Sequence, residues 1–234
     1  MNRLIHTLAL IALLLVAPLA RAELKVLACE PEWGALVKEL AGDKVSVYVA
    51  TTALQDPHRI EARPSLVAAA RNAGLVVCTG AELEVGWLPL LIRQSGNSAI
   101  QPGKPGHFEA AAYVRMLDVP QRLDRADGDV HAAGNPHIQT DPRNIALVAE
   151  PLALRLAELD PANAATYQAR SADFLTRWKA AIQRWEQSAA PLRGVPVVVL
   201  HKAFPYIQQW LGLVEVAALE PKPGVAPTSA PLCT

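Results

Sequence analysis

The chain has 234 residues, of which 51% are hydrophobic, and its 22 basic residues balance its 22 acidic ones. This composition is too apolar for an intrinsically disordered chain, and the length suits one large domain or two smaller lobes. The neutral balance and the lack of a basic run argue against nucleic acid as a partner.

The first 22 residues predict a secretory signal peptide. Arg3 gives a positive start, residues 8–17 form an apolar run, and Ala20-Arg21-Ala22 supplies a small-x-small cleavage pattern. The apolar run is short for a membrane span, and Glu23 follows it closely. We therefore expect a cleaved signal at residues 1–22 and a mature chain in the periplasm.

Short apolar runs then alternate with helical patterns, which predicts an α/β fold with mostly parallel strands covered on both faces. The expected strands are 24–29, 45–50 and 75–78, and the expected helices are 32–41, 64–72 and about 84–94, the last interrupted near Pro89. Because ligands bind at the carboxyl ends of such strands, a site is expected in the loops there. We assign residues 23–140 to this N-terminal lobe.

Cys29 and Cys78 each end one of these predicted strands. If the strands are neighbours in a parallel sheet, the two sulfurs could form a disulfide, which would suit an exported protein. Two buried free thiols are the alternative. Cys233 is left over near the end of the chain.

Residues 141–193 predict two helices that begin with the same signal. Asp141 and Asp160 are N-cap residues, and a proline in the first turn follows each of them. The expected ranges are 142–158, with a kink at Pro151, and 161–189. Aromatic residues recur at helical spacing in the second helix, and we expect them to anchor it in the core. This helix is long enough to join two lobes.

The α/β pattern returns after Gly194. Strands are expected over 195–200 and 214–219, with a helix over 203–210 between them. Two strands and one helix cannot cover both faces of a sheet, so residues 194–234 are predicted to form an incomplete C-terminal lobe.

Three histidines lie in loops suited to metal ligands. His58 follows the second strand, His201 ends the first strand of the C-terminal lobe, and His137 follows Pro136, which favours an extended Asn135 and restricts the loop. One such histidine is most often incidental, whereas three spread over two lobes predict a metal ion between them. Neutral imidazoles suit zinc, copper, nickel or iron rather than calcium or magnesium. No CxxC or HExxH motif is present, so the prediction rests on context.

The motifs around these histidines resemble a known family. They are Asp56-Pro57-His58 with Glu61 and Pro64-Ser65, Asn135-Pro136-His137 with Asp141-Pro142-Arg143-Asn144, Leu159-Asp160-Pro161 with Tyr167, and Val198-Val199-Leu200-His201 with Ala203-Phe204. In this order they are similar to the zinc/manganese-specific solute-binding proteins of bacterial ABC importers. The resemblance covers essentially the whole mature chain to about Pro227.

This resemblance implies two α/β lobes joined by one long rigid helix, with His58, His137 and His201 as ligands of a metal in the cleft. In that family a histidine at the third position goes with zinc and an acidic residue with manganese, so we expect Zn²⁺ rather than Mn²⁺. It also implies a non-enzymatic, monomeric protein that captures the ion and delivers it to a membrane ABC permease.

The sequence also departs from the family. The family's fourth ligand is an acidic residue late in the second lobe, and this chain ends before that position; Glu61, Glu220 and His131 are candidates to replace it. Residues 229–234 do not resemble the family, which suggests a truncation or a shifted reading frame. Two further departures are Lys202, where many members carry an acidic residue, and a short polar loop with Asp124, Asp127, Asp129 and His131, where many carry a long His-rich one.

Two other functions remain open from the sequence. A secreted zinc hydrolase would combine the three histidines with a zinc-bound water, and Glu61 would be its general base. A metal-binding adhesin or periplasmic chaperone could use the same scaffold.

Overall fold

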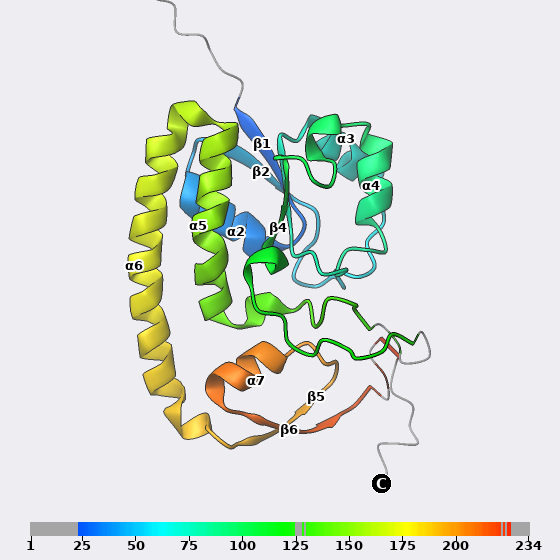
Figure 1. The fold of residues 1–234 in the computed structure, drawn as a ribbon, viewed down its shortest axis with the longest axis vertical. Coiled ribbons are helices and arrows are strands. Elements are labelled where there is room, and N and C mark those ends of the chain that lie inside the picture. Colours follow the sequence, from blue (N-terminus) through cyan, green and yellow to red (C-terminus); the bar gives the residue numbers. More distant parts are fainter. Residues whose placement is uncertain (1–22, 125–127, 129, 221, 223, 226–234) are drawn as a thin grey trace, which may run out of the picture.

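The computed structural model describes residues 23–124, 128, 130–220, 222, 224 and 225, so the predicted signal peptide and Cys233 lie outside it. The described residues form two parallel sheets, one with four strands in the order β2-β1-β3-β4 and one with the two strands β5 and β6. Figure 1 shows the larger sheet above the smaller one, with helix α6 running alongside both. The predicted α/β class with mostly parallel strands and a long helix is confirmed.

The larger sheet is covered by helices on both faces. Its strands are β1 (Leu24–Ala28), β2 (Val45–Val49), β3 (Leu75–Cys78) and β4 (His107–Glu109), and the first helices are α2 (Pro31–Ala41), α3 (Pro64–Asn72) and α4 (Leu88–Ser95). Alternation along β1 separates two cores: Val26 and Ala28 pack in the cluster that includes α2, whereas Leu27 and Cys29 pack in the cluster that includes α3 and α4. A sheet buried on both faces explains why its strands read as continuous apolar runs.

The structure corrects two expectations in this lobe. Strand β4 was not predicted, because three residues are too few to show a pattern. It forms by pairing in parallel with β3 at the edge of the larger sheet. Helix α4 begins at Leu88 rather than at Glu84, so Pro89 lies in its first turn and does not interrupt it. Residues before Leu88 form a turn, in which Ala81 and Glu82 have φ of 50° and 67°.

Helices α5 (Pro142–Leu159) and α6 (Ala164–Ala189) follow, and α5 begins at the predicted signal. The Asp141 carboxylate accepts a hydrogen bond from the Arg143 N–H at 2.8 Å, as an N-cap should. Residues Pro161–Asn163 form a 3-10 turn, so the long helix begins three residues later than predicted. Tyr167 and Phe174 are buried as expected, whereas the Trp185 side chain lies largely at the surface.

The smaller sheet and its helix lie at the far end of α6. They are β5 (Pro196–Val199), α7 (Pro205–Leu211) and β6 (Val214–Ala218), and the two strands pair in parallel. Tyr206 of α7 is buried, and its hydroxyl donates to the Asn135 carbonyl at 2.7 Å and accepts from the Leu117 N–H at 3.1 Å. This tyrosine therefore fixes α7 against the segment that carries His137. Among the described residues, no helix combines the length and apolarity needed to cross a membrane.

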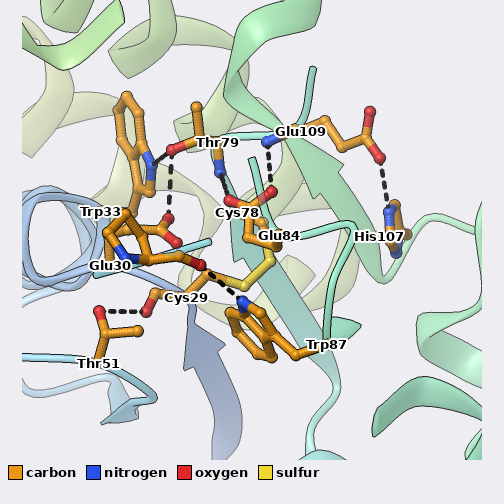
Figure 2. The surroundings of a disulfide bond; sticks show 12 residues. Cys29, Glu30, Trp33, Thr51, Cys78, Thr79, Glu84, Trp87, His107 and Glu109 are labelled. Atoms are coloured by element: carbon orange, nitrogen blue, oxygen red, sulfur yellow. Dashed lines mark hydrogen bonds and ion pairs between the residues drawn. A yellow bond between two sulfur atoms is a disulfide. The ribbon is translucent and has the colours of Figure 1, made fainter. Parts of the chain in front are cut away.

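Cys29 and Cys78 form a disulfide, which decides between the two alternatives left open by the sequence. Their Cα atoms lie 4.8 Å apart at the ends of the paired strands β1 and β3 (Figure 2). Both cysteines are fully buried in the core that faces α3 and α4. The bond therefore ties together the two strands whose following loops lie at the carboxyl edge of the sheet.

Candidate metal site

His58, His137 and His201 come together as predicted. One nitrogen from each ring lies within 4.8 Å of the others, and the ring centroids are 5.4 to 5.9 Å apart. His58 comes from the loop after β2, His137 from the loop before α5, and His201 from the loop after β5. Segments far apart in sequence thus bring three imidazoles to one point between the two sheets, which is the arrangement that a bound metal ion requires.

Two of these rings are oriented by the same tripeptide, Asx-Pro-His. In the first, Asp56 Oδ1 accepts from the backbone N–H of His58 at 3.0 Å and lies 2.7 Å from its Nδ1. In the second, Asn135 Oδ1 accepts from the N–H of His137 at 3.1 Å and lies 3.0 Å from its Nδ1. The proline restricts the preceding residue, and the short side chain then bonds the residue two positions on. This local pattern fixes each ring before any metal arrives.

The third ring is oriented from a distant segment. Glu220, just after β6, places Oε2 at 2.7 Å from Nδ1 of His201, and the same oxygen accepts from the Gly224 N–H at 2.9 Å. Burial alone would raise the pKa of the Glu220 carboxyl, but these two hydrogen bonds lower it overall. A charged acceptor on Nδ1 fixes the tautomer and makes the other nitrogen a better metal ligand.

Hydrogen bonds at Nδ1 leave Nε2 of each ring to face a metal. At His58 this is most evident, because Nε2 is buried and has no hydrogen-bond partner among the described residues. Burial, together with the nearby rings of His58, His201 and His131, lowers the pKa of His137 to about 3 from its ordinary value of 6.5. His137 is therefore neutral at pH 7 and need not lose a proton to bind a cation.

The turn between β3 and α4 packs against the loop that carries His58. The Trp87 indole N–H donates to the Pro57 carbonyl at 2.8 Å, next to the ligand. Gly86 packs so closely on the same loop that an added Cβ would lie 2.7 Å from the His58 carbonyl oxygen. A larger residue at position 86 would displace His58, so this glycine is required by close approach rather than by backbone conformation.

Two buried glutamates hold this turn in place. Glu84 accepts from the backbone N–H groups of Thr79 and Gly80 at 2.7 and 3.1 Å, and Glu30 accepts from the Thr79 hydroxyl at 3.2 Å (Figure 2). Burial raises the pKa of Glu84 to about 7 and raises that of Glu30 well above its ordinary value of 4.5. Because two adjacent buried carboxyl groups resist double ionisation, the pair retains a proton near neutral pH.

The other predicted site residues lie outside the three-histidine cluster. Glu61 is exposed and contributes no ligand atom to it. Glu220 contacts His201 instead of the metal position. His131 stacks on His58, with ring centroids 5.4 Å apart. Asp127 and Asp129 lie outside the described residues.

An α/β protein that gathers three histidines between two parallel sheets belongs to the class of metal-binding proteins. The family described as "Zinc-uptake complex component A periplasmic" matches residues 26–232, and the chain belongs to this family. The match starts close to the first residue of the predicted mature chain and includes the whole site.

Individual relatives agree with this assignment. The chain is 26% identical to the "High-affinity zinc uptake system protein ZnuA" of Paracoccus denitrificans, over 91% of this chain and 72% of that protein. It is 27% identical to the "Manganese ABC transporter substrate-binding lipoprotein scaA" of Streptococcus gordonii, but spans only 45% of its length. Among solved structures, a crystal structure of ZnuA superimposes with a TM-score of 0.73 at 25% identity, over 89% of this chain and 75% of that one. The family works with an ABC permease and binds metal ions.

Proposed function

We propose that this protein captures Zn²⁺ in the periplasm between its two sheets, with His58, His137 and His201 as ligands, and delivers it to an ABC permease. The convergence of these three rings, each oriented through Nδ1, is the observation that carries the proposal. Relatives named for zinc and relatives named for manganese are similar to this chain in sequence at nearly the same identity, 26% and 27%, so the choice of metal rests on the ligands. Three imidazoles favour zinc over manganese, which prefers oxygen.

The protein acts as a carrier rather than as a catalyst in this proposal. Among the described residues, Glu61 is exposed, Glu220 is hydrogen-bonded to His201, and Asp56 is hydrogen-bonded to His58, so each of these carboxylates is engaged elsewhere or open to solvent. Nothing in the site favours an adhesin, and the named relatives are transporter components. We expect a monomer, since each ligand comes from the same chain and the site needs no second copy.

Zinc titration of the mature chain tests the proposal. Competition with a chromogenic chelator measures the zinc affinity of each variant. Replacing His58, His137 or His201 singly by alanine should abolish tight binding. His107 provides the matched control, because its ring nitrogens contact the Ile100 carbonyl and Glu109 outside the site; His107→Gln should bind zinc as the wild type does. Unchanged affinity in His137→Ala would refute the assignment. Zinc-dependent stimulation of the cognate permease in proteoliposomes tests delivery, and sedimentation tests the monomer.

A further inference from the structure

The three-histidine site leaves one position of a four-coordinate zinc ion to be filled. Protein-bound zinc is usually tetrahedral, and sites that only hold the ion close all four positions with side chains. The identity of this fourth ligand rests on the proposed function, because it concerns the same site. Among the described residues, the sequence offers Glu61, Glu220 and His131 as candidates for it. Asp56, whose Oδ1 lies 2.7 Å from Nδ1 of His58, already orients that ring.

The two glutamates are poor candidates on their contacts. Glu220 already accepts hydrogen bonds from His201 Nδ1 and the Gly224 N–H, so moving it to the metal would release the ring that it orients. Glu61 is exposed on the His58 loop. Neither supplies an atom to the cluster in which the three ligand nitrogens lie within 4.8 Å of one another.

His131 is placed differently, because its ring already lies against a ligand. Its centroid is 5.4 Å from that of His58, within the 5.4 to 5.9 Å that separates the three ligand rings from one another. Imidazoles that share a tetrahedral zinc, with Zn–N bonds of about 2.0–2.1 Å, have ring centroids roughly 5 Å apart. The planes of His131 and His58 are stacked at 26°, so a side-chain rotation is still needed for His131 to join the cluster.

The backbone that follows His131 is fixed, and space lies beside its ring. The Ala132 N–H donates to Glu82 Oε2 at 2.6 Å, and the His131 carbonyl accepts from the Gly134 N–H at 3.1 Å, so the peptide group between His131 and Ala132 is hydrogen-bonded at both its N–H and its carbonyl. A cavity of about 420 Å³ adjoins the ring and is also lined by His137 and His201. The space into which the ring would turn is therefore next to the metal position.

We propose that His131 is the fourth zinc ligand, and that its ring turns from the face of His58 into this cavity to complete a shell of four imidazole nitrogens. Such a shell carries no negative charge, so the site discriminates by ligand type rather than by charge. Four neutral nitrogens favour zinc over manganese and exclude calcium and magnesium, which require oxygen.

X-ray absorption at the zinc edge, measured on the zinc-loaded mature chain, counts the imidazoles directly. The wild type should show four nitrogen ligands with imidazole scattering. The matched variant is His131→Phe, which keeps an aromatic ring against His58 but has no nitrogen to offer; it should show three imidazoles and one oxygen. Its zinc affinity should fall by at least about tenfold, which is the effect of one lost interaction of moderate strength.

The outcomes separate this inference from the function on which it rests. Three imidazoles and one oxygen in the wild type, with equal affinity in His131→Phe, would overturn the role of His131 while His137→Ala still abolished binding. Loss of that oxygen in Glu220→Gln would instead make Glu220 the fourth ligand. Retention of tight binding in His137→Ala would refute the three-histidine site itself.

Discussion

Asn135 is a positioning residue, and the roles of its side-chain oxygen and nitrogen can be tested separately. Its Oδ1 accepts both hydrogen bonds from His137, at 3.1 and 3.0 Å, whereas its Nδ2 donates to the Lys202 carbonyl at 2.7 Å, one residue after His201. The side chain therefore orients one ligand and also links it to the segment that carries another. We expect Asn135→Ala to weaken zinc binding even though residue 135 does not touch the metal.

The size of the effect follows from the contacts. Losing the partner of a ligating histidine costs on the order of 10- to 100-fold in metal affinity, or about 1.4 to 2.7 kcal/mol. The Lys202 contact is exposed, so water can replace it, and we expect most of the loss to come from the His137 end.

Asn135→Asp is the matched control. A carboxylate can still accept both hydrogen bonds from His137 but cannot donate to Lys202, and Asp56 already fills the same role for His58 in this chain. Isothermal titration with zinc, corrected for the urea stability of each metal-free variant, should rank wild type and Asn135→Asp together and Asn135→Ala well below. Equal losses in the two variants would show that the link to Lys202, and not ring orientation, controls affinity.

Three further predictions concern stability. His137 has a folded pKa of about 3, below its ordinary 6.5, so the unfolded chain gains the proton first as the pH falls. In urea unfolding between pH 6.5 and 5, metal-free wild type should lose roughly 1.6 kcal/mol relative to His137→Asn, and parallel curves would contradict this. Replacing Cys29 and Cys78 together by alanine removes a cross-link between residues 49 positions apart and should cost about 4 kcal/mol in the chain-entropy model. Urea unfolding compares the oxidised wild type with the variant, and reduction of the wild type should remove most of this difference; a full difference that survives reduction would contradict the model. Tyr206→Phe removes the hydroxyl that pairs the partly buried Leu117 N–H and Asn135 carbonyl and should cost about 1–3 kcal/mol by urea unfolding; an unchanged midpoint would mean that water replaces the hydroxyl.

Much of the fold could be predicted because its elements carry local signals. Apolar runs marked β1, β2 and β3, and an Asp-Pro pair marked the start of α5. The second Asp-Pro pair marked the 3-10 turn that comes just before α6. Strand β4 and the turn before α4 could not be predicted in the same way. The strand depends on pairing with β3, and the turn depends on Glu84, whose buried carboxyl binds two backbone N–H groups. Tertiary contacts of this kind leave no periodic pattern in the sequence.

The site shows the same division between local and distant causes. His58, His137 and His201 were predicted, and the repeated Asx-Pro-His tripeptide was a signal from which the roles of Asp56 and Asn135 could have been found. The role of Glu220 had no such signal, because its contact with His201 exists only when β5 and β6 pair. The domain boundaries at residues 140 and 193 stay predictions.

The three histidines differ in what orients their rings. His58 and His137 are each held by a residue two positions away. The His137 segment is also hydrogen-bonded to the β5–α7–β6 part of the chain, through Asn135 to the Lys202 carbonyl and through the Tyr206 hydroxyl to the Asn135 carbonyl.

His201 is held by Glu220, which follows β6 of the smaller sheet, and α6 connects this sheet to the larger one (Figure 1). In the proposed site, the position of the third ligand relative to the other two therefore depends on Glu220 and on the contacts that join the two sheets. If the site is as proposed, weakening these contacts should lower zinc affinity without disturbing the local hydrogen bond of Asp56 with His58.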